Sequence, residues 1–315
     1  MQATKTILAG AVAAALFGSA VHAQPADKYI VGTGSKTGTY FSMMTDVASK
    51  CPGLEIKEEV GGTLANLANA SAKRIDLFVG QSDAFALAQR DNPSSYKGMM
   101  VVAGLHNEEV QVFALPDLVV AKNVFGRGGR PPSTLADLAK EEIKIGAWGG
   151  SLKTADTLNR SMAKRIPGWK PNVVSMTAAD ESTLMTQMKA VGASVVIRTS
   201  GTPDSIFEKL PANSLRPIAV DTQIVKDYPD SFTTSSYEYQ NLSRQTVGTI
   251  AVQALLIARR FDDPADIARI TALRDCIEKN LSTFRNGRGF HWKWADVNLK
   301  TRVNQPMFPP STPVR

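Results

Sequence analysis

A glycine-rich turn near the amino terminus is the part of this sequence whose residues are best suited to bind a ligand. It runs from Gly32 to Gly38, between a short apolar strand (29–31) and an amphipathic helix that begins near Tyr40. The free backbone N–H groups of such a turn and the positive end of the helix dipole attract an anion. The turn therefore predicts an anion-binding site at the start of this helix.

Two nucleotide-binding motifs are similar to this turn but differ from it in spacing. Gly32, Gly34 and Gly38 contain one residue too many for the G-x-G-x-x-G dinucleotide motif. In a P-loop the residue before the lysine is glycine, whereas here it is Ser35. An anion other than a nucleotide is therefore favoured, and the alternative is a turn that only starts a helix.

A Gly-Gln-Ser-Asp segment centred on Ser82 follows a strand and begins a helix, as the nucleophile elbow of a hydrolase does. Ser82 would need a base, and beyond residue 23 the chain offers only His106 and His291, neither in a triad pattern. The alternative role of Ser82 is to cap the helix N-terminus or to donate a hydrogen bond to a ligand. Two histidines and two distant cysteines give no zinc-like spacing, so no metal is expected.

A second pair of turns, at 146–154 and 198–201, repeats the order strand, turn, helix of the first pair. The cations nearest to the turns are Lys36, Lys153 and Arg198. An arginine at a strand end can hold a carboxylate with two hydrogen bonds, and its alternative role is a salt bridge on the rim. Tyr40 and Trp148 are candidates to line a cleft or to fill the core.

The first 23 residues have the features of a signal peptide, with Lys5, an apolar stretch over 7–21 and small residues before the cleavage site at Ala23. We therefore expect cleavage after Ala23 and a location in the periplasm. The longest later apolar run, 250–258, is too short to cross a bilayer.

Charge and cysteine content limit the partners and the chemistry. The net charge is +7, but basic and acidic residues are interspersed along the whole chain, which argues against a nucleic-acid surface. An oxidising compartment permits one disulfide between Cys51 and Cys276, and two buried thiols are the alternative.

The length of the mature chain favours two domains, because single cores stop growing near this size. Strand patterns alternate with helical ones, which predicts mainly parallel sheets covered by helices, with ligands at the carboxyl ends of the strands. We expect lobe 1 over 24–117 plus 225–315 and lobe 2 over 118–224, with crossings near 115–122 and 220–228. The expected strands are 29–31, 75–79, 99–105, 111–115, 143–147, 172–176, 194–197 and 215–220.

Six segments together resemble one known family. In order along the chain they are 32–42, 62–67, 74–83, 133–146, 149–154 and 245–259. Their motifs are similar to those of the TAXI-type solute receptors, which serve TRAP transporters. The resemblance implies an α/β, two-lobed type II periplasmic-binding-protein fold, in which each lobe is a mixed, mainly parallel sheet flanked by helices and the ligand cleft lies between the lobes.

The resemblance implies a receptor that captures a small organic anion, a C5 dicarboxylate or an acidic amino acid such as glutamate, and delivers it to a TRAP permease. We expect a monomer with no cofactor and no chemistry on the ligand. Lys36, Lys153 and Arg198 depart from the family pattern by adding positive charge. The alternatives are an ABC-importer receptor, a periplasmic serine hydrolase that uses Ser82, and a two-lobed adaptor without a small ligand.

The candidate ligand-binding residues lie in or beside the four turns. They are Lys36, Thr37, Gly38, Thr39, Tyr40, Gln81, Ser82, Trp148, Ser151, Lys153, Thr154, Arg198 and Thr199.

Overall fold

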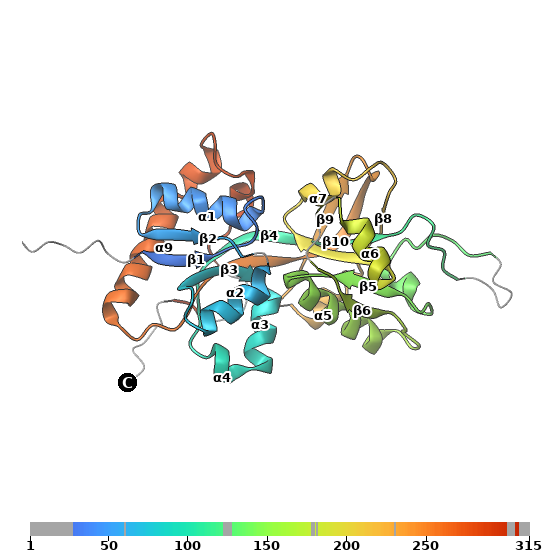
Figure 1. The fold of residues 1–315 in the computed structure, drawn as a ribbon, viewed down its shortest axis with the longest axis horizontal. Coiled ribbons are helices and arrows are strands. Elements are labelled where there is room, and N and C mark those ends of the chain that lie inside the picture. Colours follow the sequence, from blue (N-terminus) through green and yellow to red (C-terminus); the bar gives the residue numbers. More distant parts are fainter. Residues whose placement is uncertain are drawn as a thin grey trace, which may run out of the picture.

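The computed structural model describes residues 28–59, 61–121, 128–177, 180, 182–229, 231–300 and 306–308. They form two α/β lobes joined by two long strands, β4 (Met100–Ala114) and β10 (Ser243–Ala258) (Figure 1). The predicted signal peptide lies outside the described residues.

Lobe 1 is built on three parallel strands, each followed by a helix. The sheet has the order β2-β1-β3-β10-β4, in which β10 is antiparallel to both of its neighbours. Helices lie on both faces of this sheet (Figure 1). The elements are β1 (Tyr29–Gly32), α1 (Thr39–Lys50), β2 (Leu54–Lys57), α2 (Gly62–Ser71), β3 (Leu77–Gln81), α3 (Ser82–Asp91), α4 (Pro93–Tyr96), α9 (Pro264–Asn286) and η2 (Trp292–Asp296).

Lobe 2 repeats this plan with the parallel strands β6, β5 and β7, and β7 pairs antiparallel with the second half of β4. Its elements are η1 (Leu135–Leu138), β5 (Lys144–Ala147), α5 (Gly150–Arg165), β6 (Asn172–Ser175), α6 (Leu184–Val191), β7 (Ala193–Ser200), α7 (Ser205–Glu208), β8 (Arg216–Pro217), α8 (Ile224–Asp227) and β9 (Thr233–Tyr239). The predicted α/β fold of two lobes, with the type II periplasmic-binding-protein arrangement, is confirmed.

The crossings between the lobes lie inside β4 and β10, not in the segments 115–122 and 220–228 that the sequence suggested. The first half of β4 pairs with β10, and from Glu109 onward it pairs with β7. The strand patterns expected at 99–105 and 111–115 belong to this one strand. The polar residues between them, from His106 to Glu109, interrupt the apolar pattern and therefore imitate a loop.

Hydrophobic packing shows which residues belong to each lobe. Phe232 and Ile250 pack in the same cluster as Val112 and Leu158 of lobe 2, so the expected boundary at residue 225 is too early. The first-lobe core gathers Val31, the buried face of α1 and the apolar face of α9. Lobe 2 therefore extends to the middle of β10, because the aromatic residues of β9 are needed to close its core.

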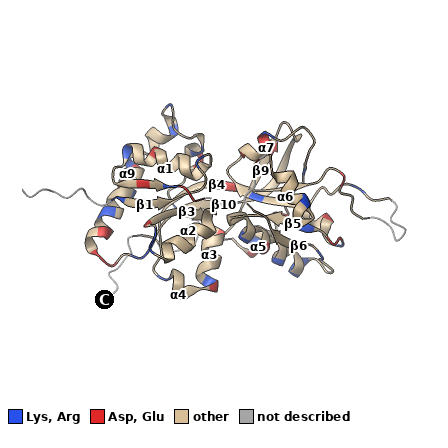
Figure 2. Cartoon of the chain, in the orientation of Figure 1, with Lys and Arg blue, Asp and Glu red and all other residues tan. Residues whose placement is uncertain are grey.

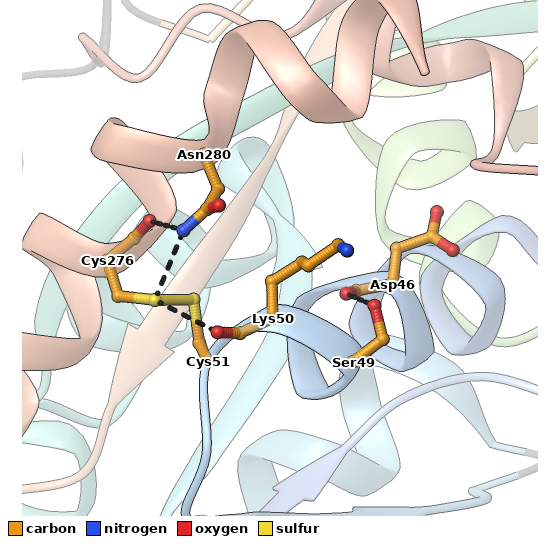
Figure 3. Close-up of a disulfide and its surroundings, with 6 residues drawn as sticks. All are labelled: Asp46, Ser49, Lys50, Cys51, Cys276 and Asn280. Atoms are coloured by element: carbon orange, nitrogen blue, oxygen red, sulfur yellow. Dashed lines mark hydrogen bonds between the residues drawn. A yellow bond between two sulfur atoms is a disulfide. The ribbon is translucent and has the colours of Figure 1, made fainter. Parts of the chain in front are cut away.

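Helix α9 begins where the sequence predicts and is tied to α1 of lobe 1 by a disulfide. The Asp263 side chain accepts a hydrogen bond from the Ala265 N–H, with Pro264 next to it, which is the helix start that the sequence predicts. Cys276 of α9 forms a disulfide with Cys51 at the end of α1, over a sequence separation of 225 residues (Figure 3). Asn280 donates a hydrogen bond to the Cys276 carbonyl at 2.9 Å.

In the described part of the chain, no helix is both long and apolar enough to span a bilayer.

Candidate functional site: the junction between the lobes

The amino termini of α1, α2, α3 and α5 meet where the two lobes face each other. Each helix follows a parallel strand, and parallel strands end at a common edge of their sheet. The N-cap residues are Gly38, Gly61, Gln81 and Gly149, and none of them makes a side-chain capping bond. No N-cap side chain therefore accepts from the first N–H groups of these helices, although in α3 the Ala84 N–H donates to Asp83 Oδ1 at 2.7 Å. Such helix starts create a positive potential.

Short distances show that the helix starts of the two lobes touch. A Cβ built on Gly150 at the start of α5 would lie 2.2 Å from Gln81 Oε1 and 3.0 Å from Thr63 Oγ1. A Cβ built on Gly201 would lie 3.5 Å from Thr39 Oγ1. We call this region, where 38–40, 61–63 and 81–83 of lobe 1 face 149–154 and 198–202 of lobe 2, the interlobe junction.

Two hydrogen bonds join the lobes directly across the interlobe junction. Gln81 Nε2 donates to the Thr199 carbonyl at 3.2 Å, and Thr154 Oγ1 donates to Asp83 Oδ2 at 2.7 Å. All four residues are buried. The structure is therefore a closed form in which polar groups of the two lobes contact one another.

Some polar atoms of the interlobe junction have no hydrogen-bond partner among the described residues. They are Gln81 Oε1 and Thr199 Oγ1, on side chains that are only 3% and 4% exposed. A buried polar group without a partner costs about 1–3 kcal/mol. Such atoms, one from each lobe, are the expected mark of a site that a polar ligand completes.

Buried carboxyl groups lie beside these atoms, on β4 and at the start of α3. Tyr40 donates a hydrogen bond to Glu108 Oε2 at 2.6 Å, and Gln81 also hydrogen-bonds to Glu108. Burial raises the pKa of Glu108 to about 7, and hydrogen bonds from Tyr40 and Gln81 oppose part of this rise. Burial likewise raises the pKa of Asp83 to about 6.

Glu109, the next residue of β4, is by contrast paired with a cation. Lys293 of η2, itself 2% exposed, lies with its Nζ 3.4 Å from Glu109 Oε2 and 3.0 Å from Asp296 Oδ2. The N–H and hydroxyl of Thr202 also donate to Glu109 Oε2. Figure 2 shows the acidic positions of β4 at the centre of the molecule, between the lobes.

His106 completes the buried polar face of β4. Its Nε2 lies 4.0 Å from Glu108 Oε1, and its ring meets that of Tyr40 edge-on at 6.0 Å between centroids. Burial lowers the pKa of His106 to about 3, so the imidazole is neutral at physiological pH. The His106–Glu108 contact is therefore not an ion pair.

Two of the three cations expected in the site have other partners. Lys36 is a correction: its side chain is 71% exposed and its Nζ lies 3.8 Å from Glu58, so it points to solvent. Arg198 donates to Asp204 Oδ2 at 3.0 Å, with its guanidinium 4.8 Å from the centre of the Trp148 ring. Lys153 is half-buried on the first turn of α5.

The remaining candidates divide between the interlobe junction and its support. Thr37 is exposed, whereas Trp148 packs in the core of lobe 2. The Ser151 hydroxyl accepts a hydrogen bond from the Thr199 N–H at 2.9 Å. The Ser82 hydroxyl accepts one from the Gln253 N–H at 3.2 Å, and within the described residues no hydrogen bond joins it to a histidine.

The sequence analysis missed Asp83, Glu108, Glu109 and Lys293 as members of this region. A pair of acids inside an otherwise apolar run is the available signal for β4, but such a polar interruption is also typical of a loop between two strands. Lys293 had no signal, because only the fold brings η2 to β4. A shallow hollow at Gln89, Pro93, Ser94, Tyr96 and Lys97 contains none of the candidate residues.

No family model and no curated protein matches the sequence. Among solved structures, a histidine kinase sensor domain with similarity to periplasmic binding proteins is 12% identical, with a TM-score of 0.48, covering 87% of this chain and 98% of that one. A putative L-cystine ABC transporter from Listeria monocytogenes is 12% identical, with a TM-score of 0.45, covering 85% and 99%.

A third similar structure is the reduced OxyR regulatory domain from Pseudomonas aeruginosa, 13% identical with a TM-score of 0.41, covering 80% of this chain and 98% of that one. We take no ligand and no partner from similarities this distant.

Within the described ranges, no group of three or more His, Cys, Asp or Glu side chains is placed to hold a metal ion.

Proposed function

We propose that this protein is an extracytoplasmic solute receptor that holds a small organic anion at the interlobe junction. The observation that carries the proposal is the meeting of four helix starts, none capped by its N-cap side chain, around buried polar atoms that lack partners among the described residues. Helix starts stabilise an anion through N–H groups that need no rearrangement. A water-excluded junction strengthens this attraction, because the dielectric constant there is low.

The two lobes share β4 and β10, and this connection favours a hinged receptor. Two strands can bend where their pairing changes from one lobe to the other, which lets the lobes separate and close around a solute. When the lobes separate, the bonds Gln81–Thr199 and Thr154–Asp83 open and their polar groups become available. In the proposed mechanism the solute replaces these direct contacts and closure shields it from water.

The proposed solute is a C5 dicarboxylate or an acidic amino acid such as glutamate, and the proposed partner is the membrane permease of a TRAP transporter. The resemblance of the six sequence segments to TAXI-type receptors supports both. The export signal at residues 1–23 supports a periplasmic location. The charge of Arg198, near the end of β7, acts on Glu108 in the junction and lowers its pKa.

A thermal-shift screen of the mature chain tests the proposal. The panel contains L-glutamate, L-aspartate, glutarate, 2-oxoglutarate and succinate, with putrescine as a cationic control. A solute present at a hundredfold excess over its Kd stabilises the folded state by about 2.7 kcal/mol. We expect at least one carboxylate to raise the melting temperature by several degrees while putrescine has no effect. A panel without any shift would contradict the proposal.

A further inference from the structure

We propose that Glu108 of β4 binds the ammonium group of the solute, so that the receptor takes an amino acid in preference to the matching plain dicarboxylate. This inference rests on the proposed function, because it assigns a substrate class to the same site. The proposed subsite is made of acceptor oxygens from both lobes. They belong to Glu108, Gln81 and Thr199.

The first argument is that Glu108 has no cation as a hydrogen-bond partner among the described residues. Its bonds come from the neutral groups of Tyr40 and Gln81, and the neighbouring His106 is neutral. Arg198 acts on Glu108 through its charge alone, and its Nε donates to Asp204. A buried carboxylate is costly unless a positive charge accompanies it, and the rise in the pKa of Glu108 expresses that cost.

The second argument is the contrast with Glu109, the adjacent residue on the same strand. Successive residues of a strand point to opposite faces, so the two carboxyl groups have different surroundings. Glu109 receives the buried ammonium of Lys293 at 3.4 Å and two donors from Thr202. The fold therefore provides a resident ammonium for one glutamate of β4 and leaves the other with neutral donors.

The third argument is the chemistry of the atoms without partners. A primary ammonium group has three donors and no acceptor. Gln81 Oε1 is an acceptor only, the Thr199 hydroxyl can accept, and Glu108 is a carboxyl group. Gln81 connects the set, since it hydrogen-bonds to Glu108 and to the Thr199 carbonyl across the junction.

The fourth argument concerns the two ends of the solute. Tyr40 is the second residue of α1 and Gln81 is the N-cap of α3, so Glu108 lies beside the helix starts that attract a carboxylate. A zwitterionic amino acid matches both the positive helix starts and the negative Glu108, with its carboxylate toward the helix starts and its ammonium toward Glu108. A plain dicarboxylate would bring another negative charge to a region that already holds buried Glu108 and Asp83.

Calorimetric titration of the mature chain at pH 7.5 with matched solutes tests this inference. The pairs are L-glutamate with glutarate and L-aspartate with succinate, which differ only in the amino group. We expect at least one amino acid to bind at least tenfold more tightly than its partner. Glu108→Gln removes the charge but keeps an acceptor for Tyr40, so it should erase this preference. Glu55→Gln, an exposed carboxyl on β2, is the control and should keep it.

Each result decides the matter. If the dicarboxylates bind the wild-type chain as tightly as the amino acids, the ammonium subsite is wrong while the proposed function stands. The same holds if Glu108→Gln retains a tenfold preference for the amino acid. If none of the four solutes binds, the proposed function fails and the subsite fails with it. The comparison of solutes on the wild-type chain stays decisive even where the Glu108→Gln chain does not fold.

Discussion

Glu108 and Asp83 are the residues whose surroundings say most about the interlobe junction. Both are buried in positions where their charge is unfavourable, and the pKa of each carboxyl is raised by burial. The burial of the Asp83 carboxyl is partly explained by its place in the first turn of α3, where a negative charge interacts favourably with the helix dipole. Glu108 has no such explanation within the fold alone, which is why it points to a ligand.

The buried Glu108 predicts a pH-dependent cost in stability. Its pKa is about 7 in the folded chain and 4.5 in the unfolded chain, so between these values the folded form retains a proton that the unfolded form releases. Stability contributed by this group therefore falls as the pH rises from 4.5 through 7, by about 3 kcal/mol in total. Glu108→Gln should become more stable relative to wild type by about this amount between pH 5 and pH 8.

Urea denaturation of both chains at pH 5 and pH 8 measures this difference. His106, whose pKa is lowered to about 3, changes stability in the opposite sense below pH 6.5, but it titrates in both chains and cancels. Asp83 cancels in the same way. A difference in unfolding free energy that is equal at the two pH values would contradict the burial of a cation-deficient carboxyl at position 108.

The role of a residue could be predicted where a local sequence pattern determines it. It could not be predicted where it depends on contacts that only the fold creates. The glycine turns locate the helix starts, because a turn at the carboxyl end of a parallel strand has few alternatives. The direction of a long side chain is different: Lys36 lies in the right turn yet bonds to Glu58 at the surface. Arg198 lies near the right strand end, but its Nε donates to Asp204.

At the scale of elements, the start of α5 controls how closely the lobes approach. Gly149 has φ +56, a conformation that residues with a side chain rarely adopt, and the Cβ position of Gly150 lies 2.2 Å from Gln81 Oε1. These adjacent glycines let the α5 terminus reach lobe 1. Thr154, on the next turn of the helix, then donates its hydroxyl proton to Asp83.

Thr154→Val should therefore reduce the free energy of unfolding by about 1–3 kcal/mol, because it leaves the buried Asp83 Oδ2 without its donor. Thr157→Val is the matched control on the same helix, since the Thr157 hydroxyl bonds only to the Lys153 carbonyl of its own helix. The control should stay within about 0.5 kcal/mol of wild type. Urea denaturation measures both, and an equal loss in the two variants would refute a specific contact between the lobes.

The disulfide between α1 and α9 predicts a second effect at this scale. Cys51 and Cys276 are 225 residues apart, and the chain-entropy estimate for so long a loop is roughly 5 kcal/mol. Cys51→Ser with Cys276→Ser should lower the melting temperature clearly, as should reductant on the wild-type chain. Reductant should have no further effect on the double variant. An unchanged melting temperature in the double variant would contradict a stabilising role for this bond.

A helix or strand could be predicted from the sequence where its whole hydrophobic pattern is buried within one lobe. The helix start at Asp263 and the strands of 143–147 and 172–176 are found where the sequence predicts them. β4 was divided in two because its polar centre lies at the interlobe junction, where burial is provided by both lobes. A pattern along one segment carries no information on neighbours that come from distant parts of the sequence, such as β7 and β10.

For the whole molecule, the lobes form one unit because β4 and β10 belong to both sheets and η2 of lobe 1 reaches the centre through Lys293. The number of lobes was predictable from length and alternation. The position of the crossings was not, because it depends on which strand each half of β4 and β10 joins. The proposed closure around a solute is a property of the whole molecule, because the protein atoms proposed to bind the solute come from both lobes.

The most direct test of this account is a calorimetric titration of L-glutamate and glutarate into three chains: wild type, Thr199→Val and Lys36→Ala. Thr199 offers an unpartnered hydroxyl in the interlobe junction, whereas Lys36 points to solvent. The account predicts one solute per chain for wild type, at least tenfold weaker binding for Thr199→Val, and unchanged binding for Lys36→Ala. Binding that is lost in Lys36→Ala but kept in Thr199→Val would place the solute outside the interlobe junction and contradict the account.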